Sequence, residues 1–489
     1  MTVTTATPAI TIIGSGFSGL GMAIKLKEAG FHDFVILEKA PDLGGTWREN
    51  VYPGCACDVP SHMYSFSYEL NPDWSRMFAP QREIWDYMRR TADKHDLRRH
   101  LRYDAEVVGI EYEDETRKWH VSTRDGRVFV SNAVVSGIGA LHVPSYPTIP
   151  GMESFRGRAF HSSRWDHSFD LTGKRVAVIG TGASAIQFVP RVAERAARLT
   201  VFQRTPPWIQ PKPDFRFPRA ARAAFRRVPG LARAFRNGIY WTLEARALGF
   251  TIDPRLMKVQ EIVARRHIER QIKDPELRRK VTPDYTIGCK RILLSSDYYP
   301  ALARDNVELV TDGVTEIREH SIVDGQGREH EVDAIIYGTG FKVTDALNEQ
   351  RIVGRNGVKI QDAWRDGIEA HYGISVSGFP NLFLLLGPNT GLGHNSVVFM
   401  IECQVRYVME CLRLLSREKA HALDVRQGAQ DRFNRRLRER LDHLVWNEGG
   451  CRSWYLDENG VNRTLWPGFT FEYWARTRKV KPRAYEIIR

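Results

Sequence analysis

Two glycine-rich turns of the same type lie about 166 residues apart in this chain of 489 residues. The first has the sequence GSGFSG at 14–19 and follows the apolar run 10–13. The second has GTGASA at 180–185 and follows the apolar run 176–179. In a strand–turn–helix–strand unit of this kind, the glycines allow backbone N–H groups at the helix N-terminus to approach a pyrophosphate. The sequence therefore predicts an α/β fold with two Rossmann-like dinucleotide-binding domains.

The strands that follow the two turns end in residues of opposite charge, Glu38 in the first unit and Arg204 in the second. A carboxylate at this place accepts hydrogen bonds from ribose hydroxyls but repels a phosphate, whereas a guanidinium attracts a 2′-phosphate. We therefore predict two different nucleotides, with FAD and NADPH as the simplest pair. Ala185 stands where the fingerprint has its third glycine, a position that serves helix–strand packing and tolerates a methyl group. A glycine-rich turn in an unrelated α/β protein is the alternative, and two correctly placed copies argue against it.

Prolines divide the chain into segments: three lie between 144 and 150, after the first unit, and five between 206 and 218, after the second. We expect one domain to be inserted in the other, with a strand at 332–341 returning to the first domain and the active site in the cleft between the two. The predicted segments are the first part of the FAD-binding domain at 1–145, the first part of the NADP-binding domain at 146–207, a helical insertion at 208–285, the second part of the NADP-binding domain at 286–330, and the second part of the FAD-binding domain with a C-terminal tail at 331–489.

The net charge of +13 has much of its excess between 216 and 279. No RNP, zinc-finger or helix-turn-helix signature accompanies it, so we expect no nucleic-acid partner. A weak peripheral contact of this basic segment with an anionic membrane stays open as an alternative. No apolar run approaches the roughly 20 residues of a membrane span, and the first eight residues lack the features of an export signal, so we expect a cytoplasmic protein, as a monomer or homodimer.

The six cysteines are too widely spread for a disulfide framework. Cys55 and Cys57 form a CxC rather than a CxxC motif, and no second Cys/His pair lies nearby at the spacing of metal ligands. We therefore expect ordinary thiols and no metal site.

Two longer motifs resemble those of a known family. The segment 155–166, FRGRAFHSSRWD, matches the FxGxxxHxxxW(P/D) signature of type I Baeyer–Villiger monooxygenases and stands just ahead of the second glycine turn. The segment 44–58, GGTWRENVYPGCACD, matches a second signature of that family. The chain resembles these enzymes over essentially its whole length. The resemblance implies conversion of a ketone to an ester or lactone with NADPH and O₂, through a C4a-peroxyflavin formed on FAD.

Other functions are the alternatives to this interpretation. Related flavin monooxygenases that oxygenate nitrogen or sulfur lack the pair Trp165–Asp166. A pyridine-nucleotide disulfide reductase would need a CxxC beside the flavin, which the sequence lacks, and a nucleotide sensor without catalysis is a further alternative. The segments 390–396 and 466–468 depart from the family pattern where the substrate pocket is expected, so the resemblance does not specify the ketone.

The resemblance implies that Arg291 and Asp58 are catalytic. A guanidinium, with a pKa above about 12, keeps its proton and can stabilise an anionic oxygen, and Asp58 would orient it. Lys290 is implied to help bind the 2′-phosphate, and Trp454 resembles a mobile tryptophan that covers the nicotinamide. The predicted cofactor-binding residues are Gly14, Gly16, Gly19, Glu38, Gly45, Thr46, Trp47, Asp58, Tyr64, Gly180, Gly182, Ala183, Ser184, Arg204, Thr205, Lys290, Asn389 and Trp454.

Ordinary structural roles are the alternatives for several of these residues. For Asp58 the alternative is a turn cap, for Arg291 an ion pair with a surface carboxylate, and for Lys290 a solvated strand edge. His161 is interpreted as a hydrogen-bonding residue of the interdomain linker rather than an acid–base catalyst, although the linker itself is a plausible hinge.

Overall fold

The computed structural model describes residues 5–343, 350–451 and 453–489. Its first sheet is parallel throughout and carries the first glycine turn. The strands of this sheet, in spatial order, are β20 (Leu382–Leu384), β8 (Ala133–Ser136), β2 (Ile10–Ile13), β3 (Phe34–Leu37) and β4 (Leu101–Arg102). β2, β3 and β8 are buried at every position, as in parallel sheets that are covered on both faces.

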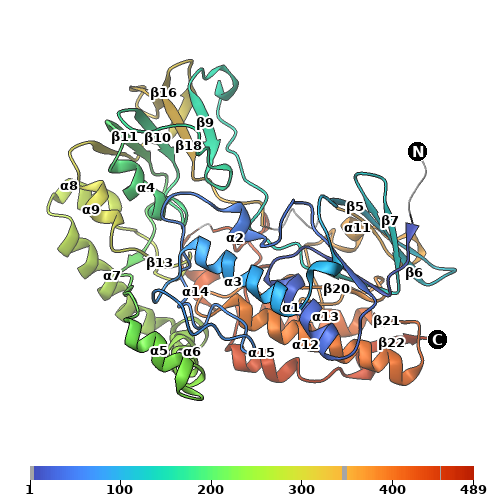
Figure 1. Cartoon of the computed structure of the whole chain (residues 1–489). Coiled ribbons are helices and arrows are strands. Elements are labelled where there is room, and N and C mark those ends of the chain that lie inside the picture. The colour runs from blue at the N-terminus through green and yellow to red at the C-terminus, as the bar shows by residue number, and fades with distance from the viewer. Residues whose placement is uncertain (1–4, 344–349, 452) are drawn as a thin grey trace.

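Helices cover one face of the first sheet and a mixed sheet covers the other (Figure 1). On the helical face, α1 (Phe17–Glu28) packs against α12 (Val397–Glu418). The strands of the mixed sheet are β1 (Thr5–Ala6), β7 (Val128–Ser131), β6 (Lys118–Thr123), β5 (Val107–Glu113) and β19 (Arg351–Val353). Trp119 of β6 is fully buried and donates its indole N–H to the carbonyl of Pro380 at 2.7 Å, which joins this sheet to the chain entering β20.

The second sheet is also parallel throughout and carries the second glycine turn. Its strands, in spatial order, are β14 (Val307–Val310), β11 (Arg198–Phe202), β10 (Arg175–Ile179), β18 (Ala334–Tyr337) and β9 (Arg158–His161). Figure 1 shows it at the top of the molecule, with the three-stranded sheet β15 (Val314–Ile317), β16 (Ser321–Asp324) and β17 (Glu329–Glu331) beside it. Together the two parallel sheets confirm the predicted α/β class.

The prediction that a strand at 332–341 returns to the first domain is wrong. The strand there, β18, belongs to the second sheet. β18 lies between β10 and β9 in the second sheet, where Val176 pairs with Ala334 and His161 with Tyr337. A short apolar run that is buried on both faces suits either parallel sheet, so its pattern does not specify which one it joins. The second sheet therefore extends beyond the predicted boundary at 330.

Helices occupy most of the range 208–285 that was predicted as an insertion. They are α5 (Arg219–Arg227), α6 (Leu231–Thr251), α7 (Met257–Gln271) and α8 (Pro275–Val281). At the base of the insertion, β12 (Ile209–Gln210) pairs in parallel with β13 (Leu293–Leu294), so the chain leaves and returns at one place. In the described part of the chain, no helix is long and apolar enough to cross a membrane.

The described elements from α12 onward lie in the lower part of the molecule as seen in Figure 1. The elements after α12 are β21 (Ala422–Val425), α13 (Gln427–Leu441), α14 (Val445–Glu448), α15 (Thr470–Arg476) and β22 (Tyr485–Ile488), and β21 pairs with β22 in antiparallel fashion. α15 contacts α12, which places the C-terminal tail on the same core as the first glycine turn.

Candidate active site

The first glycine turn is closed by contacts that only glycine permits. Gly14 has a φ of +90° and donates its N–H to Leu37 at 2.8 Å. A Cβ on Gly19 would lie 1.9 Å from the Gly14 carbonyl oxygen, so a side chain there would push α1 off the strand. Gly16 is the N-cap of α1, and a Cβ there would meet only Gly45, at 3.8 Å. The helix N-terminus is thus open at Gly16, where the fingerprint places a pyrophosphate.

Glu38 lies beside this turn and is 5% exposed. Its carboxylate accepts hydrogen bonds from the N–H of Ser15 at 3.0 Å, the hydroxyl of Ser15 at 2.6 Å and the N–H of Ala40 at 3.1 Å. Three donors from two chain segments hold the side chain in one position. This is the geometry needed for a fixed acceptor of ribose hydroxyls.

The segment 44–58 runs from the first turn to the second domain. It begins where Gly45 faces Gly16, and Trp47 of α2 (Thr46–Glu49) donates its indole N–H to the Tyr64 hydroxyl at 3.2 Å. Tyr64 in turn contacts Phe17, with ring centroids 5.3 Å apart. At its other end the segment reaches α4 (Ala185–Ala193): the Ala56 N–H donates to the Gln187 side chain at 3.1 Å, and that side chain donates back to the Ala56 carbonyl at 3.0 Å. Asp58 therefore sits between the two nucleotide-binding units.

The second turn has the same construction. Gly180 has a φ of +107° and donates its N–H to Phe202 at 3.0 Å, and a Cβ there would lie 2.4 Å from the Gly338 carbonyl oxygen. Gly182 has open space around its Cα, and the next two residues, Ala183 and Ser184, are exposed and half-buried. The methyl group of Ala185 is buried and lies 3.3 Å from the Cβ position of Gly338. A glycine at 338 makes room for the methyl group, which explains why alanine fits at the third position of this fingerprint.

Arg204 and Lys290 form a cationic pair next to the second turn. Arg204 is exposed and has no carboxylate partner among the described residues, and Thr205 accepts a 3.5 Å hydrogen bond from Thr181 of the turn. The pKa of Lys290 is lowered, first by burial and then by repulsion from Arg204. The Lys290 ammonium lies 4.9 Å from the centre of the Tyr285 ring. Two neighbouring cations, neither of them in an ion pair with a described carboxylate, suit a multiply charged anion such as a 2′-phosphate.

Asp58 and Arg291 are 233 residues apart in sequence and form an ion pair. Nε and Nη2 of Arg291 donate to the same oxygen of Asp58, at 2.9 and 2.7 Å, and Nη1 lies 3.5 Å from the Leu392 carbonyl. Side-chain exposures of 31% and 28% leave both groups accessible from one side. The guanidinium thus has N–H donors left for a ligand.

Electrostatics keep this pair charged. Burial by itself would raise the pKa of Asp58, but the charge and hydrogen bonds of Arg291 lower it below its usual value. The charge of Asp58 raises the pKa of Arg291 further above its already high value. Arg291 is therefore a fixed positive charge over the whole physiological pH range.

Comparison with known proteins identifies the family. The sequence model of the flavin-binding monooxygenase-like family matches residues 7–218. A Baeyer–Villiger monooxygenase of Pseudomonas aeruginosa is 52% identical over 479 residues, which cover 98% of this chain and 91% of the relative. One of Streptomyces coelicolor is 48% identical, covering 98% of this chain and 92% of that relative. This chain belongs to the Baeyer–Villiger monooxygenase family.

Solved structures agree with this assignment over the whole chain. A steroid monooxygenase bound to NADP superposes with a TM-score of 0.87 at 29% identity, covering 99% of this chain and 100% of the other. A cyclohexanone monooxygenase from Rhodococcus bound to NADP⁺ gives a TM-score of 0.89 at 27% identity, covering 99% and 100%. The fold of this Baeyer–Villiger monooxygenase is thus one that holds NADP in other proteins.

The family signature at 155–166 has a structural role in this structure. His161 is fully buried, its Nδ1 accepts a hydrogen bond from the Ser163 N–H at 3.1 Å, and burial lowers its pKa to about 4. Trp165 is 9% exposed and packs on Phe160 and Phe188, with ring centroids 5.3 and 5.4 Å away. The neutral, buried imidazole fits the structural interpretation of His161, and Trp165 is a packing residue.

Asn389 and Trp454 differ in how they are placed. The Asn389 amide donates to the carbonyls of Asn462 at 2.8 Å and Leu465 at 3.2 Å, so its nitrogen is used within the protein rather than offered to a cofactor. Trp454 is 50% exposed and contacts Tyr455, with ring centroids 4.5 Å apart. Its indole is therefore free to meet a ligand at the surface of the site.

Two features of this Baeyer–Villiger monooxygenase were not anticipated from sequence. Tyr455 is 1% exposed, its hydroxyl has no hydrogen-bond partner among the described residues, and burial raises its pKa to about 12. Cys289 and Cys451 form a disulfide across 162 residues. The only sequence signals were their positions, since Cys289 precedes Lys290 and Cys451 stands near Trp454.

In the described part of the chain, the expectation of ordinary thiols is confirmed for four cysteines and is wrong for Cys289 and Cys451. Cys55, Cys57, Cys403 and Cys411 are free and buried. No group of three or more His, Cys, Asp or Glu side chains there could hold a metal ion.

Proposed function

We propose that this protein converts a ketone to an ester or lactone, using FAD, NADPH and O₂. The proposal depends most on one observation: the ion pair between Arg291 and Asp58 lies between two dinucleotide-binding turns of opposite ribose-site charge. In the family to which the chain belongs, this combination performs Baeyer–Villiger oxidation. The small-molecule substrate and O₂ are its reaction partners.

The residues present fit both cofactors. The open N-terminus of α1 at Gly16 and the fixed carboxylate of Glu38 suit FAD, whose ribose has no phosphate. The open turn at Gly182 and the cations Arg204 and Lys290 suit NADPH. When bound, NADPH supplies a hydride and FAD passes the electrons to O₂.

Arg291 is the residue that we assign to the oxygen chemistry. Attack on a carbonyl carbon requires a deprotonated, nucleophilic oxygen, and it creates a second anionic oxygen on that carbon. A guanidinium that cannot give up its proton stabilises both charges without protonating either. Asp58 accepts hydrogen bonds from two N–H groups of Arg291 and so fixes the plane of the guanidinium. The orientation of the remaining N–H donors of Arg291 is thereby fixed as well.

Purified protein provides the test. We expect bound flavin in the visible spectrum, NADPH oxidation that a ketone stimulates, and an ester or lactone one oxygen atom heavier than the ketone. A sulfoxide as the only product, from a panel of linear, cyclic and aromatic ketones together with sulfides and amines, would reject the proposal in favour of an N- or S-oxygenating enzyme. Absence of flavin reduction by NADPH without O₂ would reject both.

We further propose a weak contact between the helical insertion and an anionic membrane. Three apolar side chains of the insertion are unusually exposed: Trp241 of α6 at 59%, Ile252 at 64% and Val259 of α7 at 60%. The same segment carries exposed arginines and lysines close in sequence, among them Arg246, Arg255 and Lys258, as do helices that lie on anionic lipid surfaces. Flotation with vesicles of anionic lipid should recover the wild type but less of a Trp241→Ser/Ile252→Ser variant. Equal recovery with neutral vesicles, or a concentration-dependent homodimer that the variant loses, would reject the contact.

A further inference from the structure

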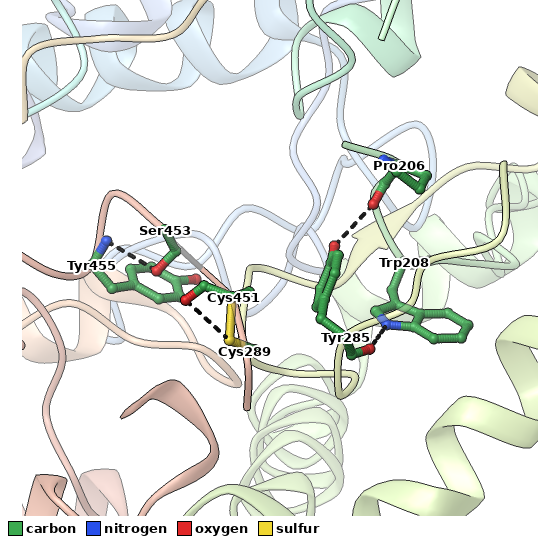
Figure 2. Close-up of a disulfide and its surroundings, with 7 residues drawn as sticks. All are labelled: Pro206, Trp208, Tyr285, Cys289, Cys451, Ser453 and Tyr455. Atoms are coloured by element: carbon green, nitrogen blue, oxygen red, sulfur yellow. Dashed lines mark hydrogen bonds between the residues drawn. A yellow bond between two sulfur atoms is a disulfide. The ribbon is translucent and has the colours of Figure 1, made fainter. Parts of the chain in front are cut away.

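The segment 285–291 connects both halves of the active site. The Tyr285 hydroxyl donates to the Pro206 carbonyl at 3.0 Å, and the Trp208 indole donates to the Tyr285 carbonyl at 2.8 Å (Figure 2). These bonds join it to the chain that follows Arg204. Its other end carries Lys290 and Arg291, the latter bonded to Asp58. A shift of this segment would move both cations at once.

The disulfide attaches a third part of the chain to this segment. Cys289 is fully buried and Cys451 is half-buried, with Cα atoms 6.1 Å apart (Figure 2). Non-covalent contacts keep the two segments together: the Thr286 N–H donates to the Gly449 carbonyl at 3.0 Å, and a Cβ on Gly449 would lie 2.5 Å from that of Cys289. The two segments are therefore held in contact by packing and hydrogen bonding as well as by the disulfide.

The chain after Cys451 reaches the ion pair. Tyr455 is buried and lies close enough to the ion pair that, after the larger effect of burial, Arg291 lowers and Asp58 raises the pKa of its phenol. Its hydroxyl has no partner among the described residues. Between the cysteine and this tyrosine, Trp454 is half exposed. The covalent bond thus fixes Tyr455 and Trp454 relative to Lys290 and Arg291.

We propose that Cys289 and Cys451 are a reversible redox site that controls how freely nicotinamide nucleotide leaves the active site. In the disulfide form the segments cannot separate at Cys289, and a nucleotide held by Lys290 is retained. In the dithiol form only hydrogen bonds and packing join them, so they separate more often. The effect on nucleotide release rests on the proposed function, because it requires NADP(H) to bind at Arg204 and Lys290.

The oxidant that we assign is a peroxide. The thiolate of Cys451, the more exposed of the two, attacks hydrogen peroxide, breaks its O–O bond and becomes a sulfenic acid, while hydroxide leaves and takes up a proton as water. The Cys289 thiol then attacks this sulfur, the S–O bond breaks, and a second water leaves. The two cysteines lose two electrons in total, and a dithiol reductant returns them by thiol–disulfide exchange at Cys451.

The bond itself is tested first. Holoenzyme is treated with hydrogen peroxide or with a phosphine reductant, alkylated, digested and examined by mass spectrometry. We expect a peptide pair linked through Cys289 and Cys451 after peroxide and two alkylated cysteines after reduction of the folded protein. Absence of the linked pair after peroxide, or a bond that resists reduction unless the protein is unfolded, would overturn the proposal.

Its effect is tested by the rate at which holoenzyme releases NADP⁺, measured by stopped flow. We expect release to be at least about threefold slower from the disulfide form, because opening of the site then requires other segments to move. The Cys451→Ser variant should release at the rate of reduced wild type whether or not it has met peroxide. The matched control is Cys411→Ser, which removes a buried free thiol outside this segment. Its rate of NADP⁺ release should still depend on the redox state, as in the wild type.

Equal release rates from the two forms of wild type would overturn the proposal, and this comparison needs no variant to fold. Cross-linking and NADP⁺ release are measured without any ketone. A protein that shows both redox effects but makes no ester would keep this proposal and lose the proposed function. A protein that makes ester at the same rate in both redox forms and releases NADP⁺ equally from both would keep the proposed function and lose this proposal.

Discussion

The two nucleotide-binding turns share one backbone design but differ in how their ribose-site residues are held. In the first, Glu38 is buried and bound by three donors from Ser15 and Ala40. In the second, Arg204 is exposed and unpaired within the described structure, next to a half-buried Lys290. A buried acceptor that protein hydrogen bonds already hold in position suits a cofactor that stays bound. Exposed cations suit a cosubstrate that must enter and leave in each cycle. The difference lies in burial as much as in charge.

The largest expected effect concerns Arg291, whose ion pair with Asp58 lies between the two turns. Arg291→Ala should lower ester formation by about 10²–10³-fold, because it removes the donor to the anionic oxygen. FAD content should stay unchanged, since the hydrogen bonds of Arg291 to described residues go to Asp58 and Leu392 rather than to the first turn. Product analysis by mass spectrometry and the visible spectrum check the two halves of this prediction.

Arg198→Ala is the matched control for that variant, because Arg198 is an exposed arginine that pairs with Glu308 away from the site. It should keep full activity. Ester synthesis by Arg291→Ala at the wild-type rate would remove this residue from the chemistry.

Arg204→Ala tests the second turn alone. Loss of a charge-assisted contact with the 2′-phosphate should raise the KM for NADPH by about 10–100-fold, at roughly 1.5–3 kcal/mol per charged hydrogen bond. The KM for NADH should change little, because NADH lacks that phosphate. Steady-state kinetics with both nucleotides measure the ratio, and equal losses for the two would contradict the assignment.

Glu38→Gln tests the first turn alone. An amide cannot accept from all three donors that the carboxylate binds, so we expect FAD affinity to fall by about tenfold with little change in the KM for NADPH. Flavin fluorescence titration of the apoprotein measures it. Glu28→Gln, an exposed position paired with Lys25, is the control. A change in NADPH affinity without a change in FAD affinity would break the comparison between the turns.

The smallest effect concerns pH and the buried His161 of the second sheet. Its folded-state pKa of about 4 lies below the roughly 6.5 of an unfolded histidine, so the unfolded chain binds more protons as pH falls. Stability from this residue is therefore present at pH 7.5 and decreases on acidification, by roughly 0.8 kcal/mol at pH 6.0. Urea unfolding of His161→Asn should show a correspondingly weaker pH dependence than the exposed-site control His167→Asn. Identical slopes would mean that the pKa of His161 is the same in the folded and the unfolded protein, which would contradict the effect of burial.

Sequence reasoning succeeded where a short stretch of chain carries the whole signal. The turns at 14–19 and 180–185 each begin with a glycine at a positive φ, a local backbone requirement that the motif itself announces. It was wrong about the strand β18, because an apolar run buried on both faces says nothing about which sheet receives it. The assignment of Asn389 to the cofactor stays a prediction, and the fold uses the amide nitrogen of this residue to hold the 462–465 segment.

The amino-acid sequence by itself determined the number of nucleotide-binding turns and the charge beside each, since both follow from side-chain chemistry within a few residues. The family resemblance led us to expect Asp58 beside Arg291, and the structure confirms this ion pair. Only the tertiary structure decided that Cys289 meets Cys451 and that Tyr455 lies close to the ion pair. Such meetings depend on how the two sheets and the helical insertion pack against one another. That packing is the sum of many weak contacts spread over the chain, and no single motif encodes it.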